Sequence, residues 1–181
     1  MPLLERVLIV LVAFALAVGV IALLSGGLLA GRDNPGIAGQ VGPLGAQFRD
    51  LGHAHLAPGA PHPAYDSRPP TSGAHVPLAV THDQVKINDD QLLEALELGD
   101  VVLFYGGDRP PAGLRALATS IAAPFTPALA AAGQAVILAP RPGTNGVLGA
   151  AWTRLIHVRT PADPALRNFL VATLGHGPPA G

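Results

Sequence analysis

A long apolar segment without polar side chains opens the chain. It covers residues 7–24, and after Ser25-Gly26-Gly27 three more apolar residues extend it to Ala30. A helix needs about 20 apolar residues to cross the hydrocarbon core of a bilayer. Because so small a domain could hardly cover every face of such a helix, the pattern predicts a transmembrane anchor in residues 1–31 and not a buried core helix.

The small residues Ser25-Gly26-Gly27 also suit the alternative of a cleaved secretion signal. The apolar run is longer than the about 7–15 residues of a signal peptide, which favours a retained anchor at the cell membrane. Because the N-terminal side is short, we expect it to stay in the cytoplasm and the C-terminal domain to be extracytoplasmic. Either alternative places the residues beyond Arg32 across the membrane.

After the anchor, the pattern of apolar positions predicts regular structure only in the second half of the chain. Residues 32–52 are Gly-rich and lack a period, which indicates a linker, and residues 53–77 are dense in Pro, Gly and His, which is typical of loops. Helical or strand spacing begins near residue 89. The predicted helices cover residues 91–98, 110–121 and a last segment from Thr160-Pro161 or Asp163-Pro164 to Gly175; the predicted strands cover 100–105, 134–139 and 147–159, the last as one long or bent strand; 122–133 suits helix or loop.

This order of elements predicts a small α+β or α/β domain in residues 53–177, with a sheet of three or more strands and about three helices. The strands at 100–105 and 134–139 flank a helix, so they can be parallel neighbours. Asp89 or Asp90 can cap the first helix and Gly99 can end it. Residues 178–181 form a Gly-Pro-rich tail.

The amino-acid composition excludes several classes of function. The net charge is −1 and only 4% of residues are aromatic, so neither the charge nor the stacking surface for nucleic acid is present. The chain has no cysteine, which excludes disulfides, thiolate metal sites and thiol nucleophiles.

One part of the loop-rich region carries an unusual motif. It reads Tyr65-Asp66-Ser67-Arg68-Pro69-Pro70-Thr71-Ser72-Gly73-Ala74-His75. Together with the helix and strand at 92–102, it resembles a bacterial family known as domain of unknown function 3105. Ala151-Trp152-Thr153 loosely matches a late segment of that family. The resemblance covers roughly residues 52–177 and implies a membrane-anchored domain whose function is uncharacterised.

Histidines and carboxylates are the candidate chemistry of this region. His53 and His55 lie on one side of the chain if the backbone there is extended, and His75 and Glu97 can join them. Neutral imidazoles with carboxylates suit Zn²⁺ or Cu²⁺. The residues alone leave open whether these side chains form a metal site or are loop and surface histidines.

The resemblance to the family also extends to individual residues of the candidate site. His55 and His75 match histidines of the family pattern and Glu97 matches its glutamate. Glu94 and Leu98 stand where the family has two further histidines; a glutamate can still ligate a metal, whereas a leucine cannot. If the family's histidines form a site, this chain has lost part of it.

The motif itself permits two interpretations. Pro69-Pro70 favours a rigid extended backbone, and Thr71, Ser72 and Gly73 a tight turn whose hydroxyls bond to nearby backbone. Alternatively, Ser72 is a nucleophile and His75 its base, although no G-x-S-x-G nucleophile elbow surrounds the serine. A hydrolase requires the Ser72 hydroxyl within hydrogen-bond reach of an imidazole.

The sequence therefore favours a non-enzymatic binding or interaction module, held to the membrane through residues 7–30, with a protein partner that the sequence does not specify. The alternative is a divalent metal site for Zn²⁺ or Cu²⁺, and a Ser/His hydrolase is a third hypothesis. The metal hypothesis requires ligand atoms that can share a point about 2.0–2.2 Å away. Its candidate ligands are His53, His55, His75, Glu94 and Glu97.

Overall fold

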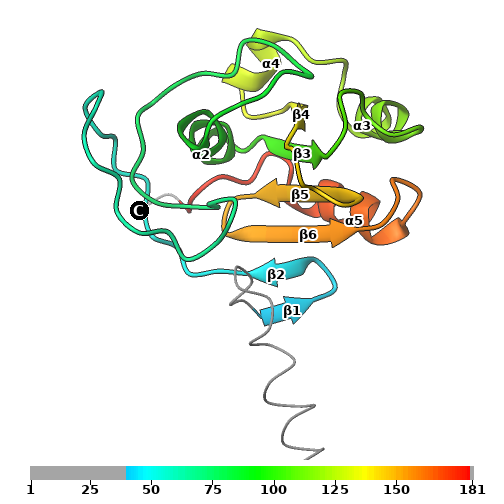
Figure 1. Cartoon of the computed structure of the whole chain (residues 1–181), viewed down its shortest axis with the longest axis horizontal. Helices are drawn as coiled ribbons and strands as arrows, with labels where there is room; N and C mark the ends of the chain where they lie inside the picture. Colours follow the sequence, from blue (N-terminus) through cyan, green and yellow to red (C-terminus); the bar gives the residue numbers. More distant parts are fainter. Residues whose placement is uncertain (1–39, 180–181) are drawn as a thin grey trace, which may run out of the picture. The chain divides into compact units, whose positions relative to one another are not determined.

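The computed structural model of this chain describes residues 40–179 (Figure 1). The predicted anchor, its alternative as a signal, and residues 32–39 of the predicted linker lie outside the described residues. No helix within residues 40–179 is long and apolar enough to cross a membrane. The anchor and the cellular location therefore stay predictions.

A six-stranded mixed sheet forms the centre of the described region. Its strands, in the order β1-β2-β6-β5-β3-β4, are antiparallel except for the pair β3 and β4, so the predicted parallel pair is confirmed. The strands are β1 (Gln40–Gly42), β2 (Gly45–Gln47), β3 (Val101–Tyr105), β4 (Val136–Pro140), β5 (Val147–Ala151) and β6 (Arg154–Val158).

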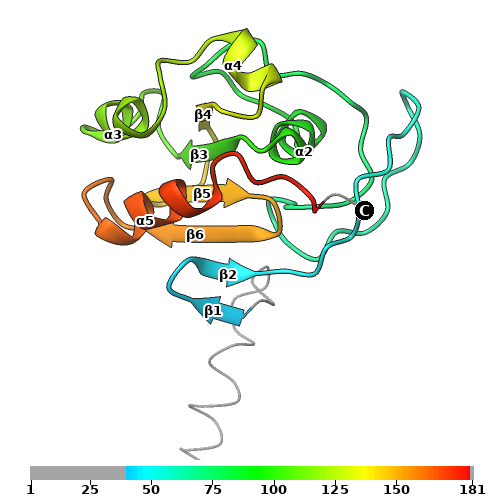
Figure 2. The same cartoon turned by 180° about the vertical axis from the view of Figure 1, so that it is seen from behind.

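Four helices accompany the sheet in the described region, and the mixture fits the α+β class. They are α2 (Asp89–Leu98), α3 (Leu114–Ile121), α4 (Pro127–Ala131) and α5 (Pro164–Thr173). Figure 2 shows α5 lying across β5 and β6. Phe169 of α5 and Leu114 of α3 pack in one buried apolar cluster with Leu103 and Tyr105 of β3. Because side chains alternate along a strand, Val102 and Phe104 face the opposite side of the sheet.

The helix α2 begins two residues earlier than the predicted helix at 91–98. Asn88, and neither Asp89 nor Asp90, is the N-cap: its side chain accepts from the backbone N–H of Gln91, whose own side chain accepts from the N–H of Asn88. This capping box satisfies two free N–H groups at once. The two aspartates then occupy the first turn, where negative charge is favourable. Gly99 ends the helix with φ 110°, as predicted.

The prediction of one long or bent strand at 147–159 is wrong. Residues 152 and 153 form a turn that divides it into β5 and β6, and Thr153 has a φ of 57°. A threonine rarely adopts a positive φ, so the local sequence gives little sign of this turn. The backbone N–H of Thr153 donates to the carbonyl of Thr71 at 3.0 Å. The turn is therefore held by a residue far away in the sequence.

One other boundary differs from its prediction, and two alternatives that the sequence left open are decided. The helix expected from Pro110 begins only at Leu114, after Gly113 with φ 86°. The ambiguous segment 122–133 contains α4, capped by Thr126. The last helix uses the second of its two alternatives, with Asp163 as N-cap.

Part of the predicted linker belongs to the sheet. Residues 40–47 form β1 and β2, and β2 pairs with β6. At Gly45, a Cβ atom would lie 2.1 Å from the carbonyl oxygen of Leu155, so only glycine allows this close approach. The strands are only three residues long, which is too short for a clear alternating pattern.

Candidate functional site

The histidine-rich segment closes on itself through backbone hydrogen bonds. His55 and His75 form an isolated parallel bridge: the N–H of His75 donates to the carbonyl of Ala54 at 3.1 Å, and the N–H of Leu56 donates to the carbonyl of His75 at 2.7 Å. Residues that are far apart in sequence thus become neighbours. The two imidazole centroids lie 5.4 Å apart.

The motif that follows Tyr65 builds the rigid interior of this loop. The hydroxyls of Ser67 and Thr71 bond to each other at 3.3 Å, and Tyr65 donates to the carbonyl of Ala74 at 2.8 Å. Gly73 has φ 126°, and a Cβ there would lie 2.8 Å from the ring of Tyr65. The buried motif side chains are Ser67, Pro69, Pro70, Thr71 and Ser72. The structural interpretation of the motif therefore accounts for these residues.

The condition for a hydrolase is not met among the described residues. The Ser72 side chain is fully buried; its Oγ donates to the carbonyl of Arg49 at 3.1 Å and accepts from the N–H of Leu51 at 3.0 Å. Both partners are backbone groups, and no imidazole of residues 40–179 bonds to this hydroxyl. These two hydrogen bonds connect the motif to residues 49–51, just before His53.

His75 is the central residue of the site because it is completely buried and strictly oriented. Its Nδ1 lies 3.0 Å from the carbonyl of Gly73. A carbonyl only accepts, so Nδ1 carries a proton and the lone pair of a neutral ring is on Nε2. That Nε2 lies 3.4 Å from carboxylate oxygens of both Glu94 and Glu97.

The two glutamates come from one side of α2. Residues three apart on a helix are neighbours, so both carboxylates point toward the loop, with side chains 17% and 18% exposed. Other positions of the same helix, Leu92, Leu93 and Leu96, are fully buried. Hydrophobic packing on one side thus fixes where the carboxylates of Glu94 and Glu97 lie.

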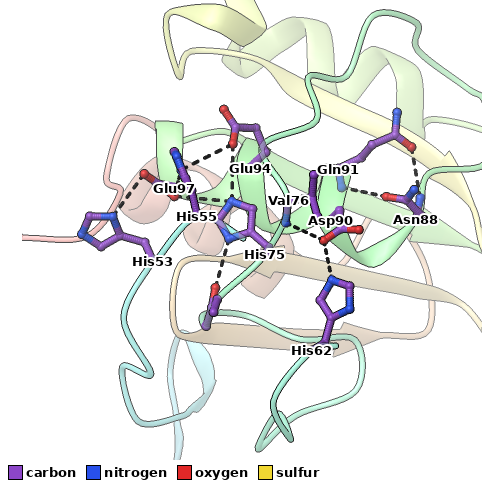
Figure 3. Close-up of polar contacts among 12 residues, drawn as sticks. His53, His55, His62, His75, Val76, Asn88, Asp90, Gln91, Glu94 and Glu97 are labelled. Atoms are coloured by element: carbon purple, nitrogen blue, oxygen red, sulfur yellow. Dashed lines mark hydrogen bonds and ion pairs between the residues drawn. The ribbon is translucent and has the colours of Figure 1, made fainter. Parts of the chain in front are cut away.

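Four side chains converge on one small volume (Figure 3). They are His55, His75, Glu94 and Glu97, and each offers one ligand atom such that all four atoms lie within 4.8 Å of one another. The Nε2 of His55 is 3.3 Å from Oε2 of Glu97 and 3.9 Å from Oε2 of Glu94. Since the side chain of His55 is 50% exposed, the volume opens to solvent on that side.

His53 lies at the margin of this cluster. Its Nδ1 donates to Oε1 of Glu97 at 3.2 Å, the oxygen that does not face His55 and His75. The edge of its ring meets the indole of Trp152, with centroids 6.2 Å apart. Trp152 is buried, and its Nε1 donates to Asp50 at 3.1 Å.

A third acid of α2, Asp90, supports the loop beside the site. Oδ1 of Asp90 accepts from the N–H of Val76 at 2.8 Å and from Nε2 of His62 at 2.7 Å. Burial works to raise the pKa of Asp90, but these two hydrogen bonds, together with the electrostatic attraction of His62 and His75, outweigh it and the pKa is lowered. Burial also raises the pKa of the neighbouring Tyr65 to about 12, with the charges of Asp90 and Asp89 acting in the same direction.

The structure thus brings the candidate ligands together. His55, His75, Glu94 and Glu97 form the cluster, and His53 contacts it through Glu97. Leu98, which replaces a family histidine, is 42% exposed and is not among the residues of the cluster. Sequence reasoning missed the supporting roles of Asp50, His62 and Asp90, because nothing in their spacing marks them.

Fold and site together define a class of protein: an α+β domain in which two loop histidines meet two glutamates of one helix. The chain belongs to the family described as Protein of unknown function (DUF3105), whose model matches residues 60–181. His53 and His55 precede the matched range. Neither the curated proteins nor the solved structures gave a match.

Proposed function

We propose that this domain binds one divalent metal ion, Zn²⁺ or Cu²⁺, between His55, His75, Glu94 and Glu97. The donor set of two imidazoles and two carboxylates suits these borderline ions. The two carboxylates neutralise the charge of the ion, so the complex adds no net charge to a partly buried position.

The spacing of the ligand atoms is the observation that carries the proposal. In a direct hydrogen bond between a charged N–H group and a carboxylate, the nitrogen and oxygen lie about 2.7–2.9 Å apart. The pair His62 and Asp90 has this length, at 2.7 Å. The four nitrogen–oxygen distances in the cluster are longer, between 3.3 and 3.9 Å.

Such distances fit an ion between the atoms. Four tetrahedral ligands about 2.0–2.1 Å from a metal lie about 3.3–3.4 Å from one another. The orientation of His75 agrees, because its Nδ1 proton is engaged by Gly73 and its Nε2 lone pair points toward the carboxylates.

The test is metal binding by the full chain, purified in detergent because of its apolar N-terminal segment. We expect about one Zn²⁺ or Cu²⁺ per chain by elemental analysis after dialysis, and a stabilisation of about 2.7 kcal/mol when the free ion is at 100 times its Kd. Glu94→Gln, which keeps the shape of the side chain, and His75→Ala should each weaken binding by more than about 10–100-fold, the usual cost of losing an outer partner.

A matched control is His82→Ala, since His82 is an exposed histidine outside the cluster. This variant should bind as the wild type does. A wild-type chain that remains metal-free after dialysis against both ions overturns the proposal, and so does equal binding by Glu94→Gln and the wild type.

A further inference from the structure

The carboxylate of Glu97 has two oxygens with different partners, and this division is the starting observation. Its Oε2 faces the Nε2 atoms of His55 and His75 at 3.3 and 3.4 Å, whereas its Oε1 accepts from Nδ1 of His53 at 3.2 Å. In Figure 3, His53 lies on the far side of Glu97 from the other two imidazoles.

We propose that His53 is a specificity-determining residue that restricts Glu97 to one-oxygen coordination and so makes the site selective for Zn²⁺ over ions such as Mn²⁺. This inference rests on the proposed function. His53 acts through Glu97 and is a positioning residue, not a ligand.

The chemistry follows from how many oxygens each ion requires. Zn²⁺ is satisfied by four ligands in a tetrahedron, whereas Mn²⁺ favours octahedral, oxygen-rich surroundings. A carboxylate supplies a second oxygen by turning to bind with both. The hydrogen bond from His53 holds Glu97 with Oε2 toward the other ligands and Oε1 away from them, so a turn that brings both oxygens to the ion would strain this bond. The bond therefore favours the lower coordination number.

His53 is itself held in place, although its side chain is 52% exposed. The indole of Trp152 meets the imidazole at an angle of 74°, and Asp50 fixes that indole through its Nε1–H. The other oxygen of Asp50 accepts from the N–H of Gly52 at 2.8 Å, which shapes the turn just before His53. Neighbours that orient a metal ligand in this way typically alter metal affinity about 10–100-fold when removed.

Three variants of the full chain test the inference, with dissociation constants for Zn²⁺ and Mn²⁺ measured by chelator competition. In His53→Asn the amide nitrogen occupies the place of Nδ1, whereas in His53→Gln it lies one bond further out. We expect His53→Ala to weaken Zn²⁺ binding about 10–100-fold and to lower the ratio of Zn²⁺ to Mn²⁺ affinity. His53→Asn should restore both values to near those of the wild type, and His53→Gln should not.

The absorption of bound Co²⁺ separates a positioning residue from a ligand. It reports the coordination number and should show four ligands in the wild type and in His53→Asn. A Co²⁺ spectrum that loses a nitrogen donor in all three variants makes His53 a ligand and overturns the inference. An unchanged affinity ratio in His53→Ala overturns it as well, while leaving the proposed metal site intact. If the wild type binds Cu²⁺ but not Zn²⁺, this inference fails; if it binds neither Zn²⁺ nor Cu²⁺, the proposed function itself fails.

Discussion

The sheet face covered by α3 and α5 and the loop at residues 49–76 differ in what fills their interiors. Beneath the helices, the buried side chains are apolar, with Leu103 and Phe169 among those completely enclosed. In the loop, the buried side chains include Ser72 and His75, and each has a hydrogen-bonding partner. Apolar burial is non-directional, whereas buried polar groups require particular partners at particular angles. The first region supplies stability, and the second supplies a defined geometry.

The largest effect should come from the apolar region. Phe169→Ala removes a fully buried aromatic side chain from the centre of the cluster and should lower the free energy of unfolding by about 3–5 kcal/mol, as measured by urea denaturation. Zn²⁺ affinity at low denaturant should change little, because Phe169 is not among the clustered site residues. An affinity that falls together with stability contradicts the division between the two regions.

The same division explains how much the sequence predicts. The apolar runs that became β3 and β4 are local signals, and they predicted a parallel pair correctly. The turn at Thr153 is stabilised by the carbonyl of Thr71, so no local pattern shows it. Non-local polar contacts of this kind are the part of the fold that sequence reasoning missed.

The site follows the same rule. The type of side chain and the family resemblance singled out His55, His75 and Glu97 correctly as neighbours. Their approach depends on the backbone bridge between residues 55 and 75, which has no sequence signature. The contact of His62 with Asp90 had no signal at all, since it joins a loop to a helix through one side-chain bond.

An intermediate effect should come from Asp100, the one fully buried acid among the described residues, which directly precedes β3. Asp100 is 1% exposed; Oδ1 accepts from the N–H of Ala135 at 2.7 Å, and Oδ2 has no partner among the described residues. Burial raises the pKa of Asp100 from 3.8 to about 7, although the bond from Ala135 opposes the shift. The folded state therefore binds this proton more tightly than the unfolded state does. The associated stability is fully present below pH 4 and is lost as the pH rises through 7.

Asp100→Asn isolates this contribution, because the amide keeps an acceptor for Ala135 and does not titrate. The wild type should lose about 2 kcal/mol more than the variant between pH 5 and pH 8, as measured by urea denaturation at each pH. All other ionisable groups are common to both chains, so their effect cancels in the difference. Parallel pH profiles of the two proteins contradict the assignment.

The smallest effect concerns α2, which buries Leu92 and Leu96 on one side and presents Glu94 and Glu97 to the loop on another. Asn88→Ala removes the N-cap and should cost about 1 kcal/mol in unfolding free energy, whereas Asn88→Asp, which keeps an acceptor, should cost less. If the buried leucines determine the position of the helix, Zn²⁺ affinity stays unchanged in both variants when it is measured by chelator competition. A large loss of affinity in Asn88→Ala alone shows instead that the cap sets the position of the glutamates, and that the polar region organises its own helix.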